Sequence, residues 1–338
     1  MKDKKLNYSN QGTRNVIEVV TLQAIVNARE TIKDVVIKTP LIYSQFLSDI
    51  CQGQVHLKLE NQQLTNSFKI RGALNRMTQL TPEERKQGVI TASSGNHGQS
   101  VALAAEYLQL SAKIVVPMNT SKAKLTKIKK HNVEIALYGD FDEVELRARE
   151  LAKKEGLIYI SPYNDPFIIA GQGTISLELF EDLNKFDMVI VPIGGGGLIS
   201  GISIAIKSIN PNVQIIGVQP EIAPTMYESI KAGKIIEVEE KATLADGILG
   251  GLENGAITFK IIQNHVDKLC IVREESVEKA INVLWNEEQQ VIEGAGALAI
   301  AYILENKQKF KGKTVVAVIS GGNIEESLFR QILEKFKV

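Results

Sequence analysis

The sequence predicts an α/β protein built mostly on parallel sheets. Short runs rich in β-branched residues alternate with longer segments whose apolar residues recur every three to four positions, the spacing of an amphipathic helix. The chain has 338 residues and is 44% hydrophobic, which is enough for about two domains with a real core. No internal repeat or low-complexity linker interrupts the pattern.

Seven stretches carry the strand pattern. In chain order they are VHLKLE (55–60), GVITAS (88–93), AKIVVPM (112–118), VEIALYG (133–139), DMVIVPI (187–193), VQIIGVQP (213–220) and TVVAVIS (314–320). The clearest helical segments between them are GQSVALAAEYLQL (98–110), FDEVELRARELAKKEG (141–156) and GTISLELFEDLNKF (173–186). This alternation indicates parallel strands joined by helices.

Composition excludes several classes of partner. The 39 Lys and Arg residues balance 39 Asp and Glu residues, so no net field attracts nucleic acid or an acidic membrane. The N-terminal MKDKKLNYSNQ reads as a polar tail without an apolar core, and the apolar tract 188–206 is broken by Pro192 and by glycines. Only Cys51 and Cys270 occur, in unrelated contexts, which argues against disulfides and cysteine metal sites. We expect a cytoplasmic protein with a small neutral or zwitterionic partner.

The basic run SKAKLTKIKKHN (121–132) could form a phosphate-binding patch. Leu125 and Ile128, however, share one helical face, and the lysines surround the rest. The run is therefore interpreted as a solvated helix surface.

A glycine run follows the strand in VIVPIGGGGLISG (189–201). Gly194, Gly195, Gly196 and Gly197 end the strand, and a helix is expected to begin at about Leu198. Consecutive glycines let backbone N–H groups converge on a phosphate, and the helix N-terminus adds its positive dipole end. A tight turn would need one or two glycines rather than four. The run predicts a site for a phosphorylated ligand.

Two common nucleotide motifs do not fit. A dinucleotide-binding motif requires a sixth-position glycine, and counting from Gly194 or Gly195 places Ile199 or Ser200 there. A Walker loop ending in the GKT of 312–314 would have Lys307 in place of its first glycine. The phosphate therefore belongs to another kind of ligand.

Two further turns follow predicted strands. In TASSGNHGQ (91–99), Ser93, Ser94 and Asn96 offer hydrogen-bonding groups suited to a carboxylate and a phenolic oxygen. His97 in the same turn is more typical of a cap or a packing residue than of a general base. In VAVISGGN (316–323), Ser320 stands at the carboxyl end of a strand, where ligands of open α/β sheets usually bind.

Lys69 lies in NSFKIRGA (66–73), between Phe68 and Ile70. A lysine beside a phenylalanine is usually a surface residue with an extended stem. Together with a phosphate site, a desolvated amine that loses its proton instead describes a site that forms an imine with an aldehyde. Pyridoxal 5'-phosphate has both the aldehyde and the phosphate and is the predicted cofactor.

Taken together, the motifs resemble the fold-type II pyridoxal-phosphate enzymes, specifically the serine/threonine dehydratase and serine racemase group. The blocks that carry the resemblance run in family order from about residue 20 to residue 325 and are ENQQLTNSFKIRGALN, TASSGNHGQSVALAA, SPYNDPFIIAGQGTISLEL, VPIGGGGLISG, ADGI, EGAGA and VISGGN. The resemblance implies two open, twisted, mostly parallel sheets with helices on both faces, as in the tryptophan synthase β-like fold. It also implies a discontinuous large domain (1–84 and 165–338) and a small domain (85–164), with the site between them.

The resemblance also implies roles for the site residues. Lys69 forms the imine with the cofactor and later moves protons, and residues 194–197 with Leu198 hold its phosphate. Asn96 bonds the 3' oxygen of the ring, and Ser320 is the partner of the ring nitrogen. A hydroxyl stabilises a charged ring nitrogen less than a carboxylate would, which favours elimination at Cβ. The substrate carboxylate is bound by the loop that contains Ser93, Ser94, Asn96 and His97.

The activity that the resemblance implies is elimination of the β hydroxyl from a small hydroxy amino acid, followed by hydrolysis to a 2-oxo acid and ammonia. L-threonine would give 2-oxobutanoate, and L-serine would give pyruvate. Ser94 matches a serine that racemases of the group use on the opposite face of the cofactor, so a serine or related amino-acid racemase with dehydratase side activity is the alternative. A hydroxyaspartate dehydratase stays open, and a β-replacement enzyme or a noncatalytic binder of a phosphorylated ligand is more distant.

This sequence departs from the pattern of the group at two places. Racemase-like members hold a divalent cation with acidic groups, but GVQPEIAPT has Gln219 and Thr225 at those places, which makes a divalent cation doubtful. Asn66 stands where many relatives have glycine. A homodimer or homotetramer is expected.

Overall fold

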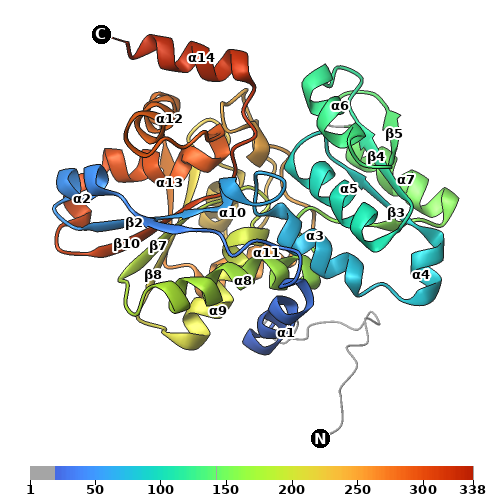
Figure 1. Cartoon of the computed structure of the whole chain (residues 1–338), viewed down its shortest axis with the longest axis horizontal. Coiled ribbons are helices and arrows are strands. Elements are labelled where there is room, and N and C mark those ends of the chain that lie inside the picture. The colour runs from blue at the N-terminus through green and yellow to red at the C-terminus, as the bar shows by residue number, and fades with distance from the viewer. Residues whose placement is uncertain (1–19, 142, 338) are drawn as a thin grey trace, which may run out of the picture.

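The computed structural model describes residues 20–141 and 143–337; residues 1–19, where a polar tail is predicted, lie outside them. The described chain forms one sheet of six strands and one of four. The larger sheet and its helices occupy the left of Figure 1, and the smaller sheet lies at the right. The prediction of an α/β fold with two mostly parallel sheets is confirmed.

The six-stranded sheet has the strand order β1-β2-β10-β7-β8-β9. Its strands are β1 (Leu41–Tyr43), β2 (Gln54–Leu59), β7 (Met188–Pro192), β8 (Gln214–Pro220), β9 (Lys268–Val272) and β10 (Thr314–Ile319). Only β1 pairs antiparallel to its neighbour. All five residues of the central strand β7 are buried, as its continuous apolar run predicts for a sheet covered on both faces.

Helices cover both faces of this sheet (Figure 1). One face packs against α2 (Gln45–Cys51), α12 (Glu274–Glu288) and α13 (Gly294–Glu305). The other packs against α8 (Pro166–Asp182), α9 (Gly197–Ile209) and α11 (Ile257–His265). Helix α1 (Leu22–Ile32) packs on the outer side of α8 and α9.

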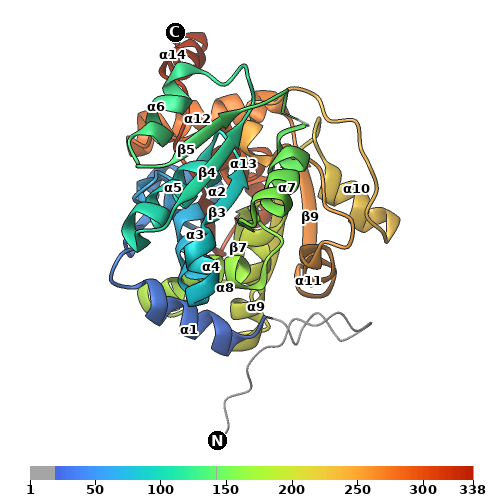
Figure 2. The same ribbon diagram turned by 90° about the vertical axis from the view of Figure 1, so that its right-hand side faces the viewer.

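The four-stranded sheet has the order β5-β4-β3-β6, with every pair parallel. Its strands are β3 (Val89–Ala92), β4 (Ala112–Val116), β5 (Glu134–Leu137) and β6 (Ile158–Tyr159). Helices α3 (Lys69–Thr78), α5 (Asn96–Leu108) and α6 (Lys122–Lys129) share one core with this sheet, and α7 (Glu143–Glu155) packs in another (Figure 2).

The four strands of the smaller sheet all fall within the predicted small domain, 85–164. Its core, however, also takes in Ile70, Leu74 and Met77 of α3, which precedes that segment. The packing of α3 therefore reaches across the expected boundary. The division into domains stays a prediction.

The remaining helices lie at the periphery. They are α4 (Pro82–Gln87), α10 (Thr225–Ala232) and α14 (Glu326–Lys335). Short 3₁₀ turns lie at Glu60–Gln62, which is buried at Glu60, and at Asp246–Ile248 and Lys307–Phe310. Capping interactions explain where helix α4 begins. The side chains of Thr81 and Glu84 cap each other's backbone N–H groups, and Pro82 occupies the first turn, where its missing N–H costs nothing.

Two glycines let α3 approach α8 closely. A Cβ on Gly72 would lie 2.4 Å from the Gln172 side chain, and a Cβ on Gly171 would lie 2.6 Å from the Arg71 carbonyl oxygen. Any larger residue would push the helices apart. The glycines of the RGA and AGQG motifs therefore fix the position of α3, the helix that begins with Lys69.

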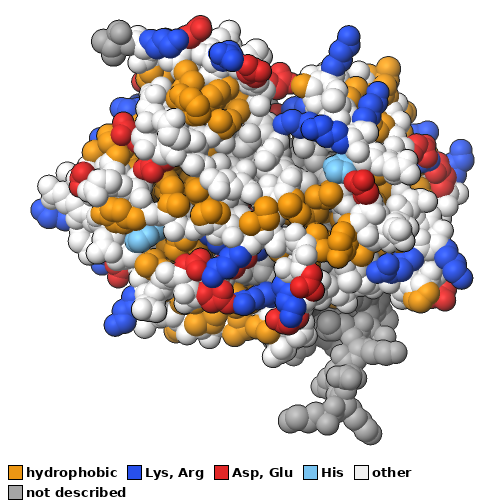
Figure 3. Space-filling model, viewed as in Figure 1, with side chains coloured by type: hydrophobic (Ala, Val, Ile, Leu, Met, Phe, Trp, Pro, Cys, Tyr) orange, Lys and Arg blue, Asp and Glu red, His pale blue; other side chains and the backbone are white. Residues whose placement is uncertain are grey.

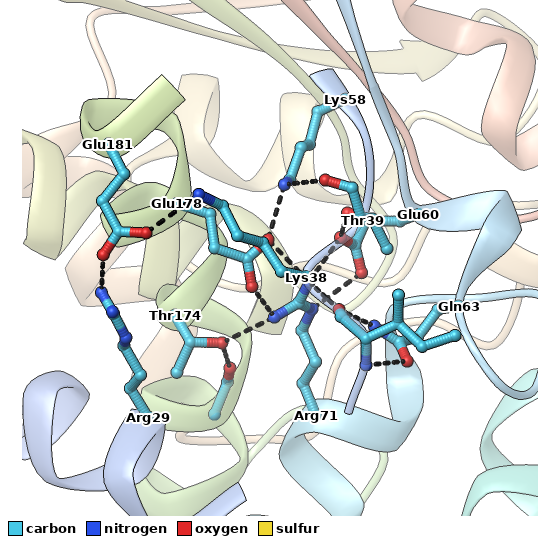
Figure 4. A network of polar contacts seen from close by, with 12 residues as sticks. Arg29, Lys38, Thr39, Lys58, Glu60, Gln63, Arg71, Thr174, Glu178 and Glu181 are labelled. Carbon is cyan, nitrogen blue, oxygen red and sulfur yellow. Dashed lines mark hydrogen bonds and ion pairs between the residues drawn. The ribbon is translucent and has the colours of Figure 1, made fainter. Parts of the chain in front are cut away.

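A buried ionic network ties α3 to α8 and to the large sheet (Figure 4). Arg71 donates to Glu60 at 2.8 Å and to Glu178 at 2.5 Å, and Lys58 donates to Glu178 at 2.5 Å. None of these four side chains is more than 9% exposed. Two cations therefore balance two carboxylates in the interior, so no charge is left unpaired there.

On the face seen in Figure 3, basic and acidic side chains are interspersed, in keeping with the zero net charge. Across the described residues, no helix combines the length and the apolar character that crossing a membrane requires. Cys51 and Cys270 are both buried, and both are free.

Candidate active site

Two adjoining cavities lie where the carboxyl ends of strands from both sheets meet. The larger has a volume of about 280 Å³ and the smaller about 60 Å³. Lys69, Asn96 and Gly195 border both cavities. Every site residue predicted from the sequence lines one or both of them: Lys69, Ser93, Ser94, Asn96, His97, Gly194, Gly195, Gly196, Gly197, Leu198 and Ser320. Their gathering follows from the tendency of parallel strands to present loops at one edge.

The glycine run forms a cup on the smaller cavity. Gly196 has φ +89°, which favours glycine, and α9 begins at the next residue, one position before the predicted start. A Cβ on Gly195 would lie 2.4 Å from the ring of Tyr163, so side chains are excluded from the cup. Bare backbone at a helix N-terminus suits a phosphate group.

Lys69 is the first residue of α3, and its amine points into the same region. Its Nζ donates a hydrogen bond to the Pro162 carbonyl oxygen at 2.9 Å. Burial lowers the pKa of Lys69 to about 8, although the carboxylate of Glu293 acts in the opposite direction. A substantial fraction of this amine is neutral near physiological pH, as a nucleophile requires.

The start of α3 is tied directly to the end of β10. The backbone N–H of Phe68 donates to the Ser320 carbonyl oxygen at 3.2 Å, and Ser67 forms a bridge with Gly321. Lys69 and Ser320 are therefore held in a fixed relation, although they are far apart in the sequence. Asn66 adopts φ +53°, a conformation that asparagine tolerates better than most residues, which explains how it replaces glycine here.

The Ser93–His97 loop leads from β3 into α5. Gly95 precedes the helix and has no side chain that could cap it. The backbone N–H groups of the first turn are therefore not bonded by a capping side chain. His97 is buried, its Nε2 lies 3.1 Å from the Ile160 carbonyl oxygen, and burial lowers its pKa to about 3, with the nearby Lys69 acting in the same direction. This environment agrees with a packing role for His97.

Several cavity residues were missed by sequence reasoning. Glu293, Asn323 and Tyr163 line the cavities although no motif assigned them a role. The only sequence feature that could have pointed to these residues is that they lie in the EGAGA, VISGGN and SPYND blocks. Lys124 and Lys127 also line the larger cavity and are partly buried, so the interpretation of residues 121–132 as a solvated helix surface is wrong at these two positions.

The segment aligned with a cation site uses its polar groups internally. The Gln219 Oε1 accepts a hydrogen bond from the Tyr227 N–H at 2.7 Å, and the Thr225 hydroxyl donates to Glu240 at 2.5 Å. Within the described ranges, no cluster of three or more His, Cys, Asp or Glu residues could hold a metal ion.

Comparison with known proteins assigns the family. A family model described as pyridoxal-phosphate dependent enzyme matches residues 32–321. The chain belongs to this family. An L-threonine ammonia-lyase of Thermotoga maritima is 47% identical over 318 residues, which cover 94% of this chain and 79% of that protein.

Two solved structures extend the comparison. The processed form of threonine deaminase isoform 2 from Solanum lycopersicum is 37% identical with a TM-score of 0.89, covering 95% of this chain and 94% of that one. Maize serine racemase is 33% identical with a TM-score of 0.88, covering 94% of this chain and 98% of that one. The predicted resemblance to dehydratases and racemases of fold type II is confirmed.

The residues present fit the cofactor of this pyridoxal-phosphate family. The cup from which side chains are excluded suits the phosphate, and the Lys69 amine with its lowered pKa suits the aldehyde. Asn96 and Ser320 border the space between them and offer an amide and a hydroxyl to the ring.

The uptake of pyridoxal phosphate by the apoprotein is expected to depend on pH through Lys69. Only the neutral amine attacks an aldehyde, so the initial rate should rise about tenfold per pH unit below pH 8 and level off above it. Stopped-flow absorbance of the imine band measures this rate. A rise that continued to about pH 10, the range of an ordinary lysine, would contradict the lowered pKa.

Proposed function

We propose that this chain is a pyridoxal-phosphate dependent L-threonine and L-serine ammonia-lyase, which releases 2-oxobutanoate or pyruvate together with ammonia. The observation that carries the proposal is the partly buried Lys69, whose amine lies between the glycine cup and the Ser93–His97 loop. The 47% identity to an L-threonine ammonia-lyase over most of the chain supports the choice of reaction.

Pyridoxal phosphate, when bound, would supply an electron sink for the pair left by removal of the substrate α proton. Residues 194–198 would hold its phosphate, Asn96 its 3' oxygen and Ser320 its ring nitrogen. Lys69 would remove the α proton, since its lowered pKa makes the neutral amine available as a base. His97, with a pKa of about 3, is too weak a base for that role near pH 7.

The substrate carboxylate would lie against the first turn of α5, next to Ser93 and Ser94. The uncapped N–H groups and the helix dipole there favour an anion. Loss of the α proton and the β hydroxyl removes one water, and hydrolysis of the released enamine consumes one. The net products are one 2-oxo acid and one ammonia.

A racemase is the second candidate, because Ser94 borders the same cavity as Lys69 and could act as a second acid or base. The 33% identity to maize serine racemase favours keeping this candidate. A hydroxyaspartate dehydratase differs only in the substrate side chain that it accepts.

A proton NMR time course in heavy water separates the candidates. The purified protein with pyridoxal phosphate is offered L-threonine, L-serine and L-threo-3-hydroxyaspartate separately. We expect accumulation of 2-oxo acid, and Ser94→Ala is expected to retain it to within about tenfold, because the α proton is removed by Lys69. Exchange of the α proton without oxo acid, with D-isomer found by a chiral assay and lost in Ser94→Ala, would instead identify a racemase.

The remaining expectations stay proposals. A cytoplasmic location is supported by the two buried free thiols, which are typical of a reducing compartment.

We expect a homodimer or a homotetramer. Light scattering during gel filtration measures which of the two forms. We expect that no divalent cation is required, so the activity should fall by less than half on treatment with a chelator.

A further inference from the structure

The amide of Asn96 is held by two neighbours in opposite roles. Its Oδ1 accepts a hydrogen bond from the Asn323 Nδ2 at 2.7 Å, and its Nδ2 donates to the Glu293 Oε1 at 2.6 Å. A primary amide has one carbonyl oxygen and two N–H groups. These two contacts therefore define which end of the amide lies where, and one N–H of Asn96 remains for a ligand in the cavities that it borders.

The direction of this pair is set by Lys127. An ammonium group can only donate, so the Asn323 Oδ1 must accept its bond, at 2.7 Å. The Nδ2 of Asn323 then faces the other way and donates to the Thr65 carbonyl oxygen at 2.8 Å and to Asn96. These side chains form a chain of hydrogen bonds in which every donor points the same way, from Lys127 through Asn323 and Asn96 to Glu293.

Glu293 is a suitable end for this chain of hydrogen bonds because an ionised carboxylate accepts at both oxygens. Burial raises the pKa of Glu293 to about 7, and the hydrogen bonds from Asn96 and the Asn323 N–H favour its ionised form. It is 6% exposed, and its second oxygen accepts the backbone N–H of Asn323 at 3.1 Å. It precedes α13 but makes no capping bond to that helix, since its side chain turns toward Asn96. A Cβ on Gly321 would lie 2.2 Å from the Glu293 Oε1, so the glycine at this position makes room for the carboxylate.

We propose that Lys127, Asn323 and Glu293 are positioning residues that orient the Asn96 amide so that its remaining N–H donates to the phenolic 3' oxygen of pyridoxal phosphate. The identity of the cofactor in this inference is taken from the proposed function. A reversed amide would present its carbonyl oxygen to an ionised phenolic oxygen, which repels it. The correctly oriented N–H instead stabilises the ionised form through a charge-assisted hydrogen bond.

The absorption spectrum of bound pyridoxal phosphate reports this orientation independently of turnover. Its imine absorbs at longer wavelength when the phenolic oxygen is ionised and at shorter wavelength when that oxygen carries the proton. Asn323→Asp keeps the size of the side chain and its acceptor for Lys127 but removes the donor to Asn96. We expect the ratio of the long to the short wavelength band to fall about tenfold or more.

Two substitutions at Glu293 separate orientation from charge. Glu293→Ala removes the acceptor and is expected to reduce the band ratio about as much as Asn323→Asp. Glu293→Gln keeps an acceptor oxygen and is expected to stay within about threefold of the unsubstituted protein. Glu288→Ala is the matched control, because Glu288 is a half-buried carboxylate on α12 that accepts from Ser44 away from both cavities.

An unchanged band ratio in fully loaded Asn323→Asp would overturn the inference, as would an equal fall in Glu293→Gln and Glu293→Ala. A wrong proposed function would give a different result from a wrong inference. The unsubstituted protein would then show the expected bands, and Asn323→Asp would change their ratio, but no 2-oxo acid would be released.

Discussion

Lys69→Ala is expected to abolish covalent attachment of pyridoxal phosphate and to reduce 2-oxo acid release about a thousandfold or more. The substitution removes both the nucleophile for the aldehyde and the base for the α proton, and general acid–base catalysis alone contributes about 10²–10⁴-fold. Borohydride reduction followed by mass spectrometry of the intact protein measures the attachment, and an oxo-acid assay measures the turnover.

Lys124→Ala is the control for this experiment. Lys124 lines the same larger cavity, but its amine pairs with Asp246 at 2.9 Å. The reduced adduct should form in Lys124→Ala and map to the peptide that contains Lys69. Attachment at another lysine, or a stable adduct in Lys69→Ala, would show that the imine forms elsewhere.

Arg71→Met is expected to lower the free energy of unfolding by about 3–5 kcal/mol, the cost of removing one partner from a buried ion pair. Glu178 would keep the cation of Lys58, but Glu60 would be left buried without a cation, with only the hydrogen bond from the Thr39 hydroxyl. Chemical denaturation followed by circular dichroism measures the change.

Two further variants test the reason for this loss. Arg71→Met combined with Glu60→Gln restores equal numbers of buried cations and carboxylates, so the double variant should be more stable than Arg71→Met alone. Arg330→Met is the surface control, because Arg330 pairs with Glu326 while both side chains are more than 70% exposed, and its loss should cost less than about 0.5 kcal/mol. Similar losses in Arg71→Met and Arg330→Met would contradict an electrostatic role for the buried network.

Much of the fold could be predicted from local patterns. All seven predicted strands are present, because long apolar runs such as 187–193 leave little choice but a buried strand. The missed strands are β1, β6 and β9. Two of them have only three and two residues, which is too short for a recognisable alternation, and Lys268–Val272 lies at a sheet edge, where burial is uneven.

The candidate site could be predicted where glycines or a reactive side chain follow a strand. Gly194–Gly197 and Ser320 are of this kind, because the end of a parallel strand is a common ligand position. Glu293 and Lys127 could not be found in this way. Glu293 precedes a helix and looks like an ordinary cap, and Lys127 belongs to a run of surface lysines until the tertiary structure turns it toward Asn323.

Helix α3 belongs to two hydrophobic environments at once, since Ile70 and Leu74 pack with the smaller sheet while Gly72 contacts α8 of the larger one. An element shared in this way is a natural pivot. If one sheet rotates relative to the other about α3, atoms near this axis travel the least, and the Lys69 amine is among them. The reactive nitrogen would therefore keep its place beside the glycine cup during such a rotation.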